Sequence, residues 1–209
     1  MSQQQPKIGG HIYRAFPTPL YRETLNLDKT IINPILRDME FRRLPSNDGW
    51  SSPSNYILDE DLAPVKPLIQ QQMDNFGYNH MKFKKSQTFE ITNSWVMKHK
   101  EGDLAGMHWH SNSLFSGILY LQCDPQSGDL LFVNQQNWNN NIFSFDYEED
   151  SPLNQDSIAT TPGEGDIIIF PSKTYHMVTP SRSKDMRFCI AFNVWVRGDV
   201  GRSNAQVTL

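Results

Sequence analysis

The sequence has few cysteines and no long apolar run. Its two cysteines, Cys123 and Cys189, are too few for a disulfide framework or a zinc site built from thiolates. The longest apolar stretches, such as 118–121 and 167–170, fall far short of the ~20 residues that span a bilayer. The N-terminal MSQQQPKIGG is polar where a signal peptide would be apolar. We therefore expect a cytoplasmic protein with reduced thiols and no membrane partner.

The sequence also lacks long blocks of one charge. It has 19 basic and 23 acidic residues, which give a net charge of -4. A protein that binds nucleic acid normally presents a basic surface to the phosphates. Direct nucleic-acid binding is therefore not expected.

Hydrophobic residues make up 38% of the 209 residues, enough for the core of one sizeable domain. We expect a single domain over 1–209, in which 1–85 form a helical support region. Apolar residues at helical spacing predict one helix, capped by Asp28 or Asn33, that runs to about Phe41. They predict a second helix from about Leu62 to Phe76, ended by Gly77.

Short β-type runs separated by Gly, Pro, Asn and Asp follow from residue 86 to 198. A series of short strands without intervening helices is typical of a sandwich or jelly roll. The segment 134–161 is too long and polar for a simple hairpin turn, and it is either a lid or binding wall or a solvated excursion. The predicted strands are 88–98, 106–110, 115–122, 129–134, 141–146, 166–171 and 186–196.

Three histidines form the main candidate for a metal site. His108 and His110 alternate in GMHWHSN, so on a strand both side chains lie on one face. His176 follows 66 residues later, after the strongly β run DIIIFP, and can return from a distant strand of the same barrel. A near pair plus a remote histidine can present three facial ligands to a transition metal and leave other positions open.

Arg187 opens the predicted strand RFCIAFNVW and is the main candidate for binding an anion. A guanidinium keeps its charge, so an inward-pointing arginine needs an anionic partner, and a carboxylate bound through two hydrogen bonds would serve. The sequence leaves open that this partner is a nearby acid of the protein, Asp185 or Asp166.

These stretches resemble the 2-oxoglutarate and iron(II)-dependent oxygenases, in particular a prolyl-hydroxylase-like subgroup with HxH, FPS, H and RxxxAFN elements. The similar segments are HWHSNSLFSGILYLQCDPQSGDLLF, GEGDIIIFPSKTYHMVTP and RFCIAFNVW, together with FPTPLY at 16–21 and GWSS at 49–52. The resemblance implies a mainly β fold with flanking helices (α+β): a double-stranded β-helix (jelly roll, cupin-like) with N-terminal helices packed on one sheet.

The same resemblance implies an Fe(II) cofactor, 2-oxoglutarate and O2 as co-substrates, and hydroxylation of an unidentified primary substrate with release of succinate and CO2. It makes His108 and His176 metal ligands and Arg187 the residue that binds the far carboxylate of 2-oxoglutarate. Tyr120 would donate a further hydrogen bond to that carboxylate. The oligomeric state stays open, with a homodimer among the alternatives.

Position 110 departs from the family pattern, which has Asp or Glu where this sequence has histidine. We expect His110 to be the third ligand, because imidazole suits iron as well as nickel, copper and zinc. Asp103 or Asp129 could instead supply a carboxylate, or the position could be left to water or an anion. Two other functions also fit: a three-histidine cupin-type dioxygenase that does not use 2-oxoglutarate, and a non-catalytic jelly-roll binding module.

Overall fold

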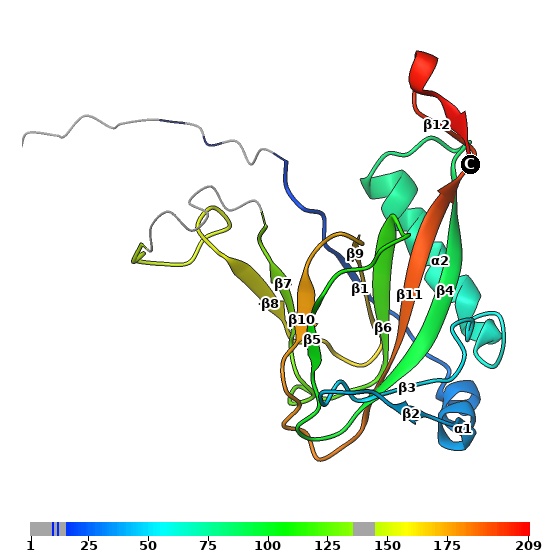
Figure 1. Ribbon diagram of the computed structural model, residues 1–209, viewed down its shortest axis with the longest axis vertical. Coiled ribbons are helices and arrows are strands. Elements are labelled where there is room, and N and C mark those ends of the chain that lie inside the picture. Colours follow the sequence, from blue (N-terminus) through cyan, green and yellow to red (C-terminus); the bar gives the residue numbers. More distant parts are fainter. Residues whose placement is uncertain (1–9, 11, 13–15, 136–144) are drawn as a thin grey trace, which may run out of the picture.

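The fold is a jelly roll of two facing antiparallel sheets, shown in a computed structural model (Figure 1). The structure describes residues 10, 12, 16–135 and 145–209. A seven-stranded sheet and a four-stranded sheet pack on each other, and all their strand pairs are antiparallel. The predicted mainly β jelly roll is therefore confirmed.

The seven-stranded sheet has its longest strands at the centre. Its order is β1 (Tyr21–Thr24), β9 (Asp166–Pro171), β6 (Phe115–Gln122), β11 (Arg187–Arg197), β4 (Thr88–His99), β3 (Trp50–Ser51) and β2 (Arg42–Arg43).

The smaller sheet contains β5 (Ala105–His108), β10 (His176–Val178), β7 (Leu130–Val133) and β8 (Ser157–Thr160). A separate hairpin, β12 (Asp199–Val200) and β13 (Val207–Thr208), lies near the C-terminus, with a 3₁₀ turn at Ser203–Ala205 between its strands.

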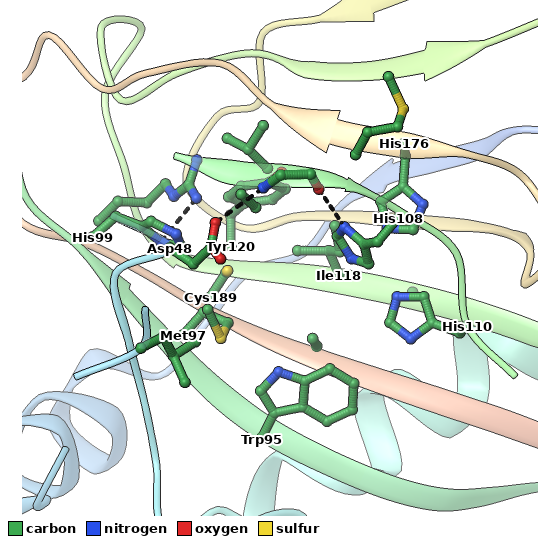
Figure 2. Close-up of a pocket in the computed structure, with 18 of the residues that line it drawn as sticks. Asp48, Trp95, Met97, His99, His108, His110, Ile118, Tyr120, His176 and Cys189 are labelled. Carbon is green, nitrogen blue, oxygen red and sulfur yellow. Dashed lines mark hydrogen bonds between the residues drawn. The ribbon is translucent and has the colours of Figure 1, made fainter. Parts of the chain in front are cut away.

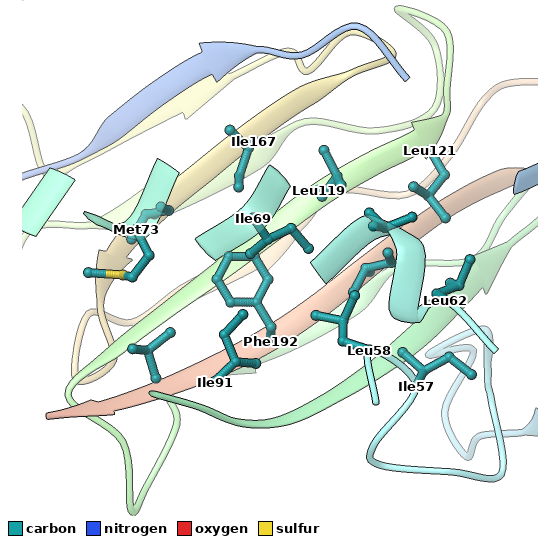
Figure 3. Close-up of a cluster of buried hydrophobic side chains, with 14 of the residues drawn as sticks. Ile57, Leu58, Leu62, Ile69, Met73, Ile91, Leu119, Leu121, Ile167 and Phe192 are labelled. Carbon is teal, nitrogen blue, oxygen red and sulfur yellow. The ribbon is translucent and has the colours of Figure 1, made fainter. Parts of the chain in front are cut away.

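The central strands are buried on both faces, because helices cover one face of the large sheet and the small sheet covers the other. In β6, Leu119 and Leu121 belong to the core beneath the helices, where α2 (Lys66–Asp74) crosses the sheet (Figure 3). The alternate residues Ile118 and Tyr120 belong to a second core between the two sheets. This alternation places Tyr120 in the interior, where the functional pocket lies.

Both predicted helices are present, with different ends. Helix α1 (Lys29–Asp38) is capped by Asp28, whose side chain accepts a hydrogen bond from the Thr30 backbone N–H at 2.9 Å. Helix α2 follows a 3₁₀ turn at Ala63–Val65 and continues as a π-helix over Asn75–His80.

Gly77 therefore does not end the second helix, and that prediction was wrong. A Cβ at Gly77 would lie 2.2 Å from the Phe89 ring, so the missing side chain lets the helical segment pack closely on β4. The glycine serves close packing here rather than termination of the helix.

The N-terminal region contributes strands as well as helices. β1, β2 and β3 lie within the segment 1–85 that we expected to be helical, and they extend the large sheet at both edges. Trp50 lies in β3, with the Arg43 guanidinium 4.2 Å from its ring centroid. Within the segment 134–161, β8 pairs with β7, and most of the predicted strand 141–146 lies outside the described residues. No described helix is long and apolar enough to cross a membrane.

Candidate functional site

The candidate site is a cavity of about 380 Å³ between the two sheets (Figure 2). All five residues predicted to form the site line it: His108, His110, Tyr120, His176 and Arg187. The histidines lie at one end of the cavity, and His99 lies at the opposite end in the view of Figure 2. The arrangement therefore has a histidine end and an arginine end.

The three histidines converge on one point. β10 and β5 pair so that His176 and His108 are directly opposite, with ring centroids 4.3 Å apart. His110 follows the end of β5, which stops at His108 rather than at the predicted residue 110, and its backbone N–H donates to the Ser172 carbonyl at 3.0 Å. One nitrogen of each ring lies within 4.8 Å of the others, a spacing suited to a single metal ion.

Backbone carbonyls orient two of these rings. Nδ1 of His108 lies 2.6 Å from the Gly106 carbonyl oxygen, and Nδ1 of His176 lies 2.9 Å from the Thr174 carbonyl oxygen. A carbonyl only accepts, so in each neutral ring Nδ1 carries the proton and Nε2 keeps its lone pair. The backbone thus selects the tautomer that leaves Nε2 available to a metal.

The surroundings keep the imidazoles of His110 and His176 neutral. Burial, opposed by the Thr174 hydrogen bond and supported by the charges of His108 and His110, lowers the pKa of His176 to about 3. Burial, and then the charge of His108, lower the pKa of His110 to about 4, and a hydrogen bond to the Asn193 side chain opposes this effect. The His110 ring also stacks on Trp95, with centroids 5.8 Å apart. Neutral imidazole is the form that binds metals.

At the other end, Arg187 is 1% exposed and only partly satisfied. Its Nη1 donates to the Ser127 carbonyl at 3.0 Å, and its Nη2 donates to Nδ1 of His99 at 2.9 Å. Neither Nε of Arg187 nor the hydroxyl of Tyr120 has a hydrogen-bond partner within the described part of the chain. Burial raises the pKa of Tyr120, so its hydroxyl keeps its proton and can donate.

No acid of the described segments forms an ion pair with Arg187, neither Asp185 nor Asp166. Asp166 is instead bound to Arg22 at 2.5 Å and to the Thr24 hydroxyl at 2.6 Å. A buried charge without a counter-ion costs several kcal/mol, so the arginine end is suited to a guest carboxylate.

The carboxylates considered as alternative metal ligands lie in other contacts. Asp103 pairs with Arg43 at 2.9 Å, and Asp129 accepts a hydrogen bond from the Thr161 hydroxyl at 2.6 Å. Neither belongs to the group of potential ligands around His110. Of the described residues, the three histidines alone form such a group.

Two residues of the site were missed by the sequence argument. His99 was given no role, yet it contacts Arg187, because β4 and β11 pair with these two residues opposite each other. Asp48 also lines the cavity, and its Oδ1 accepts from the Gly106 backbone N–H at 3.1 Å. The strand pattern could have paired β4 with β11, but no local motif identifies either side chain.

Part of the chain is similar to a known protein family. Residues 93–193 match the model of the family described as "Putative 2OG-Fe(II) oxygenase". No curated protein sequence matches the chain.

Solved structures share the fold at low sequence identity. A 2OG-Fe(II) oxygenase family oxidoreductase from Burkholderia pseudomallei is 12% identical, with a TM-score of 0.56 over 79% of this chain and 76% of that one. A Pseudomonas putida prolyl-4-hydroxylase is 12% identical, with a TM-score of 0.53 over 87% and 94%. HygX from Streptomyces hygroscopicus, crystallised with nickel and 2-oxoglutarate, is 11% identical, with a TM-score of 0.57 over 85% and 82%.

The segment matched by the family model contains the three histidines, Tyr120 and Arg187. Through this segment, the chain is similar to the 2OG-Fe(II) oxygenases.

Proposed function

We propose that this oxygenase binds Fe(II) through His108, His110 and His176, and binds 2-oxoglutarate through Arg187 and Tyr120. It then hydroxylates a C–H bond of a primary substrate and releases succinate and CO2. The observation that carries the proposal is the buried Arg187, which has no acidic partner among the described residues, in the same cavity as three converging imidazoles.

The donor set fits iron. Two rings have Nε2 free because their Nδ1 protons are bound to carbonyls, and burial keeps His110 and His176 neutral. Imidazole is a good ligand for iron, although a set of three neutral ligands leaves one more positive charge on the centre than a set with one carboxylate. This change predicts a shift in metal preference rather than loss of the site.

The arginine end fits a dicarboxylic acid. Nε of Arg187 and the hydroxyl of Tyr120, which have no partner among the described residues, are two buried donors that one carboxylate could satisfy. The cavity extends from these donors to the histidines, so the rest of a short diacid would reach the metal ligands.

When bound, iron supplies the activation of O2, coupled to the oxidative decarboxylation of 2-oxoglutarate. The chain provides binding, orientation and exclusion of water. Ile118, Phe170 and Val178 line the cavity with apolar surface. An apolar lining that excludes water strengthens the hydrogen bonds to the co-substrate and limits side reactions with water.

The third histidine also favours a second candidate, a cupin-type dioxygenase that uses three histidines and no keto acid. His110 occupies the position at which a carboxylate is usual in the proposed family. In that candidate, Arg187 would bind a different anion, and O2 uptake would not depend on 2-oxoglutarate.

The test is succinate formation by the Fe(II)-loaded protein in air with 2-oxoglutarate. We expect Arg187→Ala to abolish succinate formation while metal stays bound, because the substitution removes the cation and leaves the three histidines. Arg197→Ala is the matched control, since Arg197 lies on the same strand in an exposed ion pair with Glu90. Unchanged succinate formation in Arg187→Ala would refute the proposal, and O2 uptake without 2-oxoglutarate would select the cupin-type candidate.

A further inference from the structure

His99 lies next to Arg187, the proposed anion-binding residue. It ends β4, pairs in register with Arg187 of β11, and is 1% exposed. It also lines the cavity that contains the three metal-site histidines. Its position is therefore buried within the site rather than in the remote core.

Hydrogen bonds determine which nitrogen of His99 carries the proton. Nε2 lies 3.1 Å from the Leu104 carbonyl oxygen, which can only accept, so Nε2 is protonated. Nδ1 then has the lone pair that accepts from Nη2 of Arg187 at 2.9 Å. Burial, and then the charge of Arg187, lower the pKa of His99 to about 3, so the ring stays a neutral acceptor.

Together, His99 and Ser127 hold the guanidinium by two edges. Nη1 is bound to the Ser127 carbonyl and Nη2 to His99, which fixes the plane of the group. Nε of Arg187 and the hydroxyl of Tyr120 are buried, and neither has a partner in the part of the chain that the structure describes. If the His99 acceptor were lost, Nη2 would lose its partner and the guanidinium could rotate away from the orientation in which Nε is free.

The turn between β2 and β3 packs against the His99 ring. The carbonyl of Leu104 accepts from His99, and the backbone N–H of Leu104 donates to the Asn47 carbonyl at 3.0 Å. Gly49 has φ +76°, and a Cβ there would lie 2.6 Å from the Lys98 carbonyl oxygen and 2.8 Å from Cδ2 of His99. Close approach of this turn therefore requires glycine and restricts movement of the ring.

We propose that His99 is a positioning residue for 2-oxoglutarate: its neutral Nδ1 orients the Arg187 guanidinium so that the remaining donors meet the far carboxylate. This inference rests on the proposed function, because it concerns the same co-substrate. It assigns a role to a residue that binds neither metal nor co-substrate.

Two substitutions separate the two hydrogen bonds of His99. His99→Asn places an amide oxygen near the position of Nδ1 and keeps an acceptor for Arg187. His99→Gln places an amide N–H near the position of Nε2 and keeps a donor for Leu104. The measurement is the Kd of 2-oxoglutarate for the Fe(II)-loaded protein under nitrogen by calorimetry, with metal content and thermal unfolding of each variant.

We expect His99→Gln to weaken 2-oxoglutarate binding about 10- to 100-fold, the effect of losing a hydrogen bond to a charged group. His99→Asn should stay within about threefold of the unsubstituted protein, even if it is the less stable variant. Metal content should be full in both. Equal affinities in the two variants, or affinities that only follow stability, would overturn the inference.

The same experiment separates this inference from the proposed function. If Arg187→Ala also binds 2-oxoglutarate normally, or the unsubstituted protein does not bind it, the proposed function fails. If Arg187→Ala loses binding while His99→Gln retains it, only the role of His99 fails.

Discussion

At the scale of single residues, the backbone around the histidines prepares two of their rings for metal binding. The Gly106 and Thr174 carbonyls select the tautomers of His108 and His176, and burial keeps the His176 ring neutral. The HxH alternation was readable from the sequence because side chains on one face of a strand repeat every second residue. The hydrogen-bond partners were not, since they depend on local backbone geometry.

Position 110 provides a direct test at this scale. We expect His110→Leu to lower Fe(II) affinity at least ~10-fold, because one of three donors is lost, while His110→Asp should retain binding by supplying an oxygen ligand and a negative charge. Iron content after dialysis against a graded chelator measures both variants. Full retention of iron in His110→Leu would show that this histidine is not a ligand.

The pairing of His99 with Arg187 shows why part of the site escaped prediction. The two residues lie 88 positions apart in sequence, and they meet only through the register of two antiparallel strands. A shift of one residue in that register would turn one of them to the opposite face of the sheet. Short motifs do not carry this information.

At the scale of elements, strand cores were predictable and the edges of the sheet were not. β6 and β9 have the predicted bounds, because their apolar runs are flanked by clear turn residues. β2 and β3 contain only two residues each, too few for a periodic pattern; β3 forms by pairing with the edge of β4, and β2 by pairing with β3.

Asp166 joins β1 to β9, and its contribution should depend on pH. Burial raises the pKa of Asp166, but hydrogen bonds from Thr24, the Gly163 N–H and Arg22 outweigh this effect and leave the pKa below its usual value of 3.8. The lowered pKa in the folded state stabilises the fold above about pH 4, and this stabilisation is lost as pH falls through that lowered pKa.

We therefore expect Asp166→Asn to reduce the free energy of unfolding by about 1–3 kcal/mol at pH 7 and by less near pH 3. Urea unfolding at both pH values measures the difference. Asp38→Asn is the control, because Asp38 is exposed and, among the described residues, forms an ion pair only with its neighbour Arg37, so no measurable change is expected. An Asp166→Asn effect that is equal at both pH values would contradict this account.

The contact between the helical layer and the large sheet gives another prediction at this scale. Gly77→Ala places a methyl group 2.2 Å from the Phe89 ring, and we expect a loss of about 1–3 kcal/mol in unfolding free energy. Gly163→Ala is a matched control, since the nearest atom would lie at an ordinary 3.5 Å. Similar unfolding midpoints for the two variants in urea would show that the helix can move away from β4 at little cost.

At the scale of the whole molecule, the fold class was predictable because a series of short strands with few helices admits few architectures. The contribution of the N-terminal region to the large sheet was not, since β1 pairs with β9, more than 140 residues later in the chain. The cavity lies between the two sheets, so it exists only when both are assembled.

Ligand binding should consequently stabilise the whole fold. At 100 times its Kd, 2-oxoglutarate should stabilise the Fe(II)-loaded protein by about 2.7 kcal/mol, which corresponds to a rise of roughly 5–10 °C in Tm. Arg187→Ala should show no such rise, and Arg197→Ala should match the unsubstituted protein. Differential scanning calorimetry under nitrogen measures these shifts. An equal rise in Arg187→Ala would place 2-oxoglutarate elsewhere.

The most direct test of the central claim is a crystal structure of the protein with Fe(II) and 2-oxoglutarate, grown without oxygen. The account predicts one iron bound by Nε2 of His108, Nε2 of His176 and a ring nitrogen of His110, with the far carboxylate of 2-oxoglutarate on Arg187 and Tyr120. Iron bound away from His176, or a co-substrate that leaves Arg187 without a carboxylate partner, would contradict it.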